Sequence, residues 1–156
     1  MSRESYRERL TALRDDVLSL AEFVTDQLRD ALEALDAHDE QTARRVIESD
    51  DEVNELYLEL ESDCVDLLAL QQPVAGDLRL IVASFKILTD LERIGDLAVN
   101  LAEYALDAAY TLAPEVDVRQ IGDAVVDSVE AATAAFAEED AAACAAVDEK
   151  DNEIDT

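Results

Sequence analysis

The chain has 156 residues, 49% of them hydrophobic and 4% aromatic, and 39 acidic against 12 basic residues give it a formal net charge of −27. This length suits one domain, or one domain with part of another. The acidic excess excludes nucleic acids and anionic membrane surfaces as partners, because both would repel the chain.

The composition also indicates where the protein works. No apolar run reaches the roughly 18–20 residues of a membrane span, and the N-terminus lacks the apolar core of a secretory signal. We therefore expect a cytoplasmic protein without membrane insertion. Only Lys86 and Lys150 are lysines, and scarce lysine with heavy acid excess indicates a halophilic, high-salt cytoplasm that screens self-repulsion.

The N-terminal part carries an apolar stripe in steps of three and four residues, which predicts a long helix over residues 5–37. The stripe consists of Leu10, Leu13, Val17, Leu20, Val24, Leu28, Ala31 and Leu35. Glu22 and Asp26 point away from it, so we expect them on a solvated face. Asp39 is a suitable N-cap for the next helix.

A second helix is predicted over residues 39–70, with one irregular position in its apolar stripe. The stripe consists of Val46, Asp50, Val53, Tyr57, Leu60, Cys64 and Leu67. Burying a carboxylate without a partner is costly, so Asp50 needs a cation, a proton or water. Asn54 lies one turn further and faces nearly the same way. Cys64 is expected in the core.

A third helix is predicted over residues 74–109, after a reversal at Pro73 and before Pro114. Three long helices with short links predict an all-α, up-down-up three-helix bundle packed at shallow angles. On the third helix, oxygen-bearing side chains four residues apart form one stripe beside the apolar face. They are Glu92, Asp96 and Asn100, with Glu103 extending the stripe.

The chain then begins again, because residues 117–155 align with residues 16–54 at a constant shift of 101 and share a set of matching positions. In this alignment Asp50 matches Asp151 and Asn54 matches Asp155. The prediction is a complete three-helix repeat in residues 1–112 and an incomplete second copy in residues 113–156, holding its first helix and the start of its second. Either the sequence is a fragment, or another chain covers the open half.

Hairpin geometry predicts a metal site. Residues equally distant from the turn of an antiparallel pair lie side by side, and this pairs Asp50 with Asp96 and Asn54 with Glu92. Like charges this close cannot all stay ionised without a cation. An all-oxygen set accepts Fe, Mn, Mg or Zn. Further candidate ligands are Asn100 and, as a half-site, Asp151 and Asp155. The alternative is an acidic edge screened by water.

The segments QPVAGDLR at Gln72–Arg79 and DLERIGD at Asp90–Asp96, with D-x-x-x-[ND] at Asp50–Asn54, resemble the PhoU family of phosphate-uptake regulators. The resemblance covers residues 5–110 and continues into residues 117–155. It implies paired three-helix bundles, often dimeric, whose acidic motifs bind multinuclear metal clusters. These motifs fall on the four residues that the hairpin geometry selects, although Asn54 departs from the acidic form, which leaves nuclearity and affinity open.

The same resemblance implies negative regulation of phosphate uptake through the ATPase of a phosphate ABC transporter and, in bacteria, a phosphate-sensing histidine kinase. Two alternatives remain. A di-metal carboxylate enzyme would need Glu-x-x-His on two helices, but the only histidine, His38, lies at a helix end outside such a motif. An acidic helical scaffold would use its carboxylates for solubility alone. We therefore expect a regulator and not an enzyme.

Overall fold

The computed structural model describes residues 3–71, 75–107 and 117–138 of the chain. Helices are the only regular elements in these ranges: α1 Arg3–Ala37, α2 Glu40–Glu48, α3 Asp50–Gln71, α4 Ala75–Leu106 and α5 Val118–Glu138. The predicted all-α class is confirmed. None of the described helices has the apolar length that crossing a bilayer requires.

The first helix ends at the predicted residue, begins two residues before the predicted start, and has the predicted core face. All eight members of its apolar stripe are buried, with exposed fractions between 0% and 7%. The helix ends because His38 adopts a left-handed conformation, with φ of 54°, and the Asp39 N–H donates to the Ala34 carbonyl at 3.0 Å. Asp39 then caps α2 as predicted, accepting from the Thr42 N–H at 3.2 Å.

The prediction of one continuous helix over residues 39–70 is wrong at one position, because Ser49 separates α2 from α3. The Ser49 hydroxyl donates to the Val46 carbonyl at 2.7 Å, a local bond that competes with regular helical pairing. Gln27 of α1 holds Ser49 there, since its Nε2 donates to the Ser49 Oγ at 2.7 Å. Asp50 is therefore the first residue of α3 and not an interior position of a longer helix.

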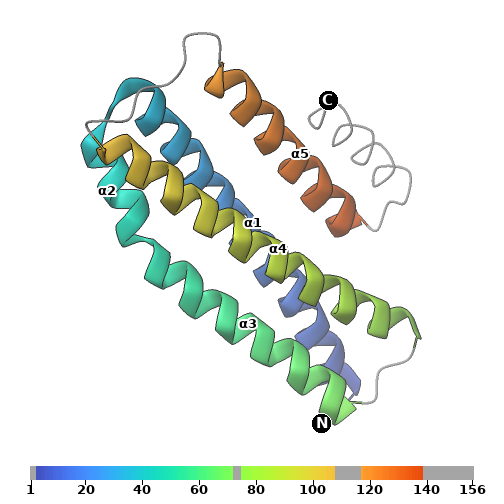
Figure 1. Cartoon of the computed structure of the whole chain (residues 1–156). Helices are drawn as coiled ribbons and strands as arrows, with labels where there is room; N and C mark the ends of the chain where they lie inside the picture. The colour runs from blue at the N-terminus through green and yellow to red at the C-terminus, as the bar shows by residue number, and fades with distance from the viewer. Residues whose placement is uncertain (1–2, 72–74, 108–116, 139–156) are drawn as a thin grey trace.

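The bundle consists of α1, the α2–α3 segment and α4, with α3 and α4 antiparallel (Figure 1). Leu20, Leu60 and Leu88 lie at its centre, each at most 1% exposed. Cys64 is fully buried, which confirms its predicted place in the core, and burial raises the pKa of its thiol to about 11. The predicted reversal at Pro73 lies outside the described residues.

The fifth helix packs along α1 and lies on the far side of α4 from α3 (Figure 1). Gly122 allows the close approach, because its Cα faces the side chain of Leu32 directly. This helix is the part of the chain that matches α1 in the internal repeat. The predicted boundary at residues 112 and 113, and the candidate ligands Asp151 and Asp155, lie outside the described residues.

Two helical glycines are expected to respond oppositely to alanine. A Cβ at Gly122 would overlap the Leu32 side chain, so Gly122→Ala should lose about 1–2 kcal/mol of stability through overpacking. At Gly95 the nearest atoms would be 3.6 Å away, an ordinary contact, so Gly95→Ala should gain about 0.5–1 kcal/mol from reduced backbone entropy. Urea denaturation measures both, and stabilisation by both substitutions would contradict the close α1–α5 packing.

Candidate functional site

The four predicted ligands lie near the start of α3 and in the middle of α4, two helices that pack against each other. Asp50 and Asn54 come from α3, and Glu92 and Asp96 from α4. Asp50, Asn54 and Glu92 are half-buried, whereas Asp96 is exposed. Asn54 Nδ2 donates to Asp50 Oδ2 at 3.3 Å, which joins the two α3 residues one turn apart. We call these four residues the acidic cluster.

The pKa values show that the two helices bring their charges together. Burial raises the pKa of Asp50, and the charge of Asp96 raises it further, while the hydrogen bond from Asn54 lowers it. Burial likewise raises the pKa of Glu92, followed by the charge of Asp96, a hydrogen bond with Asp96 and the charge of Asp50. The charges of α3 and α4 thus act on one another, which is consistent with the register that the equal distances from residue 73 predict.

Gln27 of α1 contacts Ser49 and lies against Gly95, the sequence neighbours of Asp50 and Asp96. Gln27 is buried, with 4% of its surface exposed, and its Oε1 has no hydrogen-bond partner. Gly95 lies directly against it, since a Cβ at Gly95 would be 3.6 Å from that oxygen. The Oδ1 atom of Asp50 is also buried without a hydrogen-bond partner. Two buried oxygens, Gln27 Oε1 and Asp50 Oδ1, thus lack donors, and each would accept a cation or a donor.

Sequence reasoning missed Gln27 and Ser49. A signal for Gln27 was present, because it lies between two apolar stripe residues, Val24 and Leu28, on a helix whose core face is otherwise aliphatic. Ser49 gave no comparable signal. A serine one residue before the first acid of a helix reads equally well as an ordinary helical position.

The remaining predicted ligands behave differently from the four. Asn100 is exposed and lines an apolar groove between α4 and α5. The pKa of Asp50 is raised mainly by burial, and the charge of Glu103, of the same stripe, contributes less to it than the charge of Asp96 does. As the side chains stand, no three Asp, Glu, His or Cys residues of the described ranges converge closely enough to hold a metal ion. Metal binding therefore stays a prediction.

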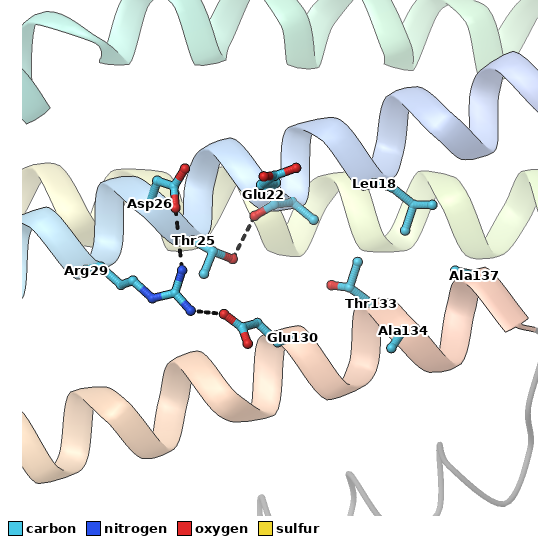
Figure 2. Close-up of a pocket in the computed structure, with 10 residues that line it drawn as sticks. Leu18, Glu22, Thr25, Asp26, Arg29, Glu130, Thr133, Ala134 and Ala137 are labelled. Atoms are coloured by element: carbon cyan, nitrogen blue, oxygen red, sulfur yellow. Dashed lines mark hydrogen bonds and ion pairs between the residues drawn. The ribbon is translucent and has the colours of Figure 1, made fainter.

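Apart from the acidic cluster, a hollow of about 380 Å³ lies between α1 and α5 (Figure 2). Arg29 spans it, pairing with Glu130 of α5 and with Asp26 at 3.5 Å. Glu22 and Asp26 line the hollow and are exposed, which confirms their predicted solvated face. Its polar groups are half-exposed ion pairs and hydroxyls bonded to their own helix backbone, as Thr25 is to the Ala21 carbonyl. This hollow is a packing feature that links α1 to α5.

Comparison with known proteins places the chain in a family. Residues 17–105 match the model of the PhoU domain. A phosphate-specific transport system accessory protein PhoU homolog of Aquifex aeolicus is 35% identical over 94% of this chain and 67% of that relative. A relative with the same description from Pseudomonas putida is 36% identical over 97% of this chain. The chain spans only 60% of the length of the latter.

The fold agrees with the sequence match. The crystal structure of PhoU from Pseudomonas aeruginosa superposes with a TM-score of 0.90 at 36% identity, over 96% of this chain and 73% of that chain. The resemblance stated from the motifs around Asp50 and Asp90–Asp96 is therefore confirmed, and so is the helical-bundle architecture. The chain belongs to the PhoU domain family.

Proposed function

We propose that this chain is a non-enzymatic, metal-binding regulator of phosphate uptake that acts in the cytoplasm. The observation that carries the proposal is its match, over 94% of its length, to a relative described as a phosphate-specific transport system accessory protein. Its action would be negative control of a phosphate ABC transporter through contact with the transporter ATPase. A phosphate-sensing histidine kinase is the second proposed partner, where the organism has one.

Two features of the acidic cluster support a bound cation. The Oδ1 of Asp50 is buried without a hydrogen-bond partner, and the pKa values of Asp50 and Glu92 are raised by burial and by neighbouring carboxylates. Asp50, Asn54, Glu92 and Asp96 would supply an all-oxygen set suited to Fe, Mn, Mg or Zn. A bound cation would supply positive charge that offsets the repulsion among the carboxylates of Asp50, Glu92 and Asp96.

The side chains of the acidic cluster would have to move for a cation to bind. Because no suitable trio converges within the described ranges, a cation would have to draw the ligands together. Asp96 can move at little cost, since it is exposed, whereas Asp50 and Glu92 are held by packing. The alternative function is an acidic scaffold without metal, and it is favoured by the same lack of convergence among the ligand side chains. Measuring the metal content separates this scaffold from the metal-binding regulator.

Deleting the gene tests the regulatory proposal. Under phosphate excess, cells lacking the protein should take up radiolabelled phosphate faster than the parent strain, because negative control of the transporter is lost. Wild-type protein should restore slow uptake, and Asp50→Ala with Glu92→Ala should not. A matched control removes two exposed acids four residues apart on α1, Glu22→Ala with Asp26→Ala, and should restore control fully.

The outcomes separate the two parts of the proposal. Uptake and transporter expression that stay unchanged on deletion would refute the regulatory role. Full complementation by Asp50→Ala with Glu92→Ala, in a strain where deletion does raise uptake, would retain the regulator and refute the role of the acidic cluster.

A further inference from the structure

The side of α4 that points away from α1 carries basic and apolar residues in a regular row. This helix lies between α3 and α5 (Figure 1). Each of Arg79, Lys86 and Arg93 lies two positions, a turn of about 200°, from a buried residue of α4. Further exposed residues continue the row in steps of three and four, so they share one face of the helix. We call this row the α4 ridge: Arg79, Val82, Lys86, Arg93, Leu97, Asn100 and Tyr104.

The α4 ridge is positive although the chain as a whole is strongly negative. Of the 156 residues of the chain, 39 are acidic, but none of the seven ridge residues is. Three of the 12 basic residues lie there instead, at intervals of seven positions. Within the described ranges these three cations form no ion pair, whereas Arg29 and Arg119 pair with carboxylates of the bundle. The exposed cations of the ridge can therefore meet the charges of a partner.

The apolar residues of the ridge adjoin a groove. Leu97 is 58% exposed and Tyr104 is 49% exposed, and both line the apolar groove of about 440 Å³ between α4 and α5. Ile121 of α5, which is 55% exposed, lines the same groove from the other side. Exposed apolar surface of this kind marks an interaction site. It begins one helical turn after Arg93, so the cations and the groove form one elongated surface.

We propose that the α4 ridge binds an acidic amphipathic helix of another protein. This inference rests on the proposed function, in which the regulator acts through contacts with partner proteins. A helix lying along the ridge meets all three cations when it carries Asp or Glu at every seventh position, because both helices then repeat every two turns. Its apolar edge covers Val82 and Leu97 and places side chains in the groove, as amphipathic helices do in hydrophobic grooves.

Charge decides which kind of helix the ridge accepts. A basic helix would bring like charges against Arg79, Lys86 and Arg93, which is unfavourable. An acidic helix is attracted by these cations but repelled by the rest of the chain, with its net charge of −27. Salt screens charges that are further apart than the screening length much more than charges in contact. At intermediate salt, attraction at the ridge should therefore exceed repulsion by the distant acids.

A synthetic peptide tests the proposal in 0.5 M NaCl with chelator, where the screening length lies between about 3 Å and 10 Å. The fluorescent probe is a helix-forming peptide about 38 Å long, the length of helix from Arg79 to Tyr104. It carries Leu in steps of three and four and Glu at every seventh position. Fluorescence anisotropy should show saturable binding to the wild-type chain. Arg79→Glu with Lys86→Glu should weaken this binding at least 10-fold, and so should Leu97→Asp.

Each variant has a matched control elsewhere on the chain. Arg7→Glu with Arg44→Glu reverses two exposed cations of α1 and α2 and changes the net charge equally, so it should leave binding unchanged. Leu58→Asp alters a residue of α3 that is 62% exposed and should also have no effect. A peptide with Lys in place of Glu should lose no affinity when Arg79 and Lys86 are reversed. Circular dichroism should show every variant folded, because the changed side chains are exposed.

Three results would overturn the proposal. The first is a wild-type chain that does not bind the acidic peptide. The second is equal weakening of binding by the ridge variants and by their controls. The third is a ridge variant whose oligomeric state differs from that of the wild type in sedimentation velocity, because this would assign the ridge to contact between copies of the chain.

Complementation separates this inference from the proposed function. In a deletion strain whose phosphate uptake is raised, Arg79→Glu with Lys86→Glu should fail to restore slow uptake, and Arg7→Glu with Arg44→Glu should restore it. Restoration by both variants would retain the regulator and refute the ridge as its docking site. If deletion leaves uptake unchanged, the regulatory role fails, and peptide binding alone decides whether the ridge accepts an acidic helix.

Discussion

Replacing Asp50 and Glu92 together by alanine is expected to abolish the stabilisation of this protein by metal. The folded state raises the pKa of both carboxyls, so at neutral pH their ionised forms oppose folding. In chelator the double variant should therefore be at least as stable as the wild type. With Mn²⁺ or Fe²⁺ added, only the wild type should gain stability, because only it keeps the acidic cluster.

The size of the effect follows from mass action. A cation at 100 times its Kd stabilises the folded state by about 2.7 kcal/mol, which is about 5–10 °C in Tm for a chain of this length. Thermal unfolding with and without metal measures it, and Glu22→Ala with Asp26→Ala controls for the loss of two charges. Equal stabilisation of the double variant and the wild type would place the metal elsewhere.

Removing salt is expected to have the other large effect. The chain carries a net charge of −27, and the screening length grows from about 3 Å at 1 M salt to about 10 Å at 0.1 M. The ion pairs found between described residues involve half-exposed or exposed groups such as Arg29 and Arg119. Exposed pairs contribute about 0–1 kcal/mol each, which is too little to offset the repulsion among 39 acids.

We therefore expect Tm to fall by about 10 °C or more between 2 M and 0.05 M NaCl, which corresponds to several kcal/mol. Most of the change should occur below about 0.5 M, where screening still varies strongly. A general salting-out effect would instead continue steadily to high concentration. A Tm that is the same in dilute buffer and in molar salt would refute the high-salt adaptation.

The parts of the fold that depend on periodicity were predictable from the sequence. The stripe from Leu10 to Leu35 is buried throughout, because a repeat near 3.5 residues can be satisfied only by a helix lying along its neighbours. The register of α3 and α4 was predictable for a similar reason. Because α3 ends at Gln71 and α4 begins at Ala75, the antiparallel pair has little freedom to slide, and the charges of Asp50 and Asp96 act on one another although they are distant in sequence.

The missed features depend on contacts between helices. At the break, Ser49 accepts a hydrogen bond from Gln27 of α1, and no local pattern in residues 39–70 indicates a partner 22 residues away. The internal repeat also shows which residues of α5 correspond to residues of α1, but it does not predict how deeply those residues are buried. Val125 and Ala132 of α5 match Val24 and Ala31 of α1, which are fully buried, yet Val125 is half-buried and Ala132 is exposed. Burial depends on neighbours, and a repeat does not supply them.

Metal content is the most direct measurement of the claim that the acidic cluster holds a cation. The protein is purified in high salt without chelator, and its metals are quantified by elemental analysis beside the variant Asp50→Ala with Glu92→Ala. We expect at least one Fe, Mn, Mg or Zn ion per wild-type chain and none in the variant. A metal-free wild type, equally stable with and without added cations, would contradict the claim and leave an acidic helical scaffold.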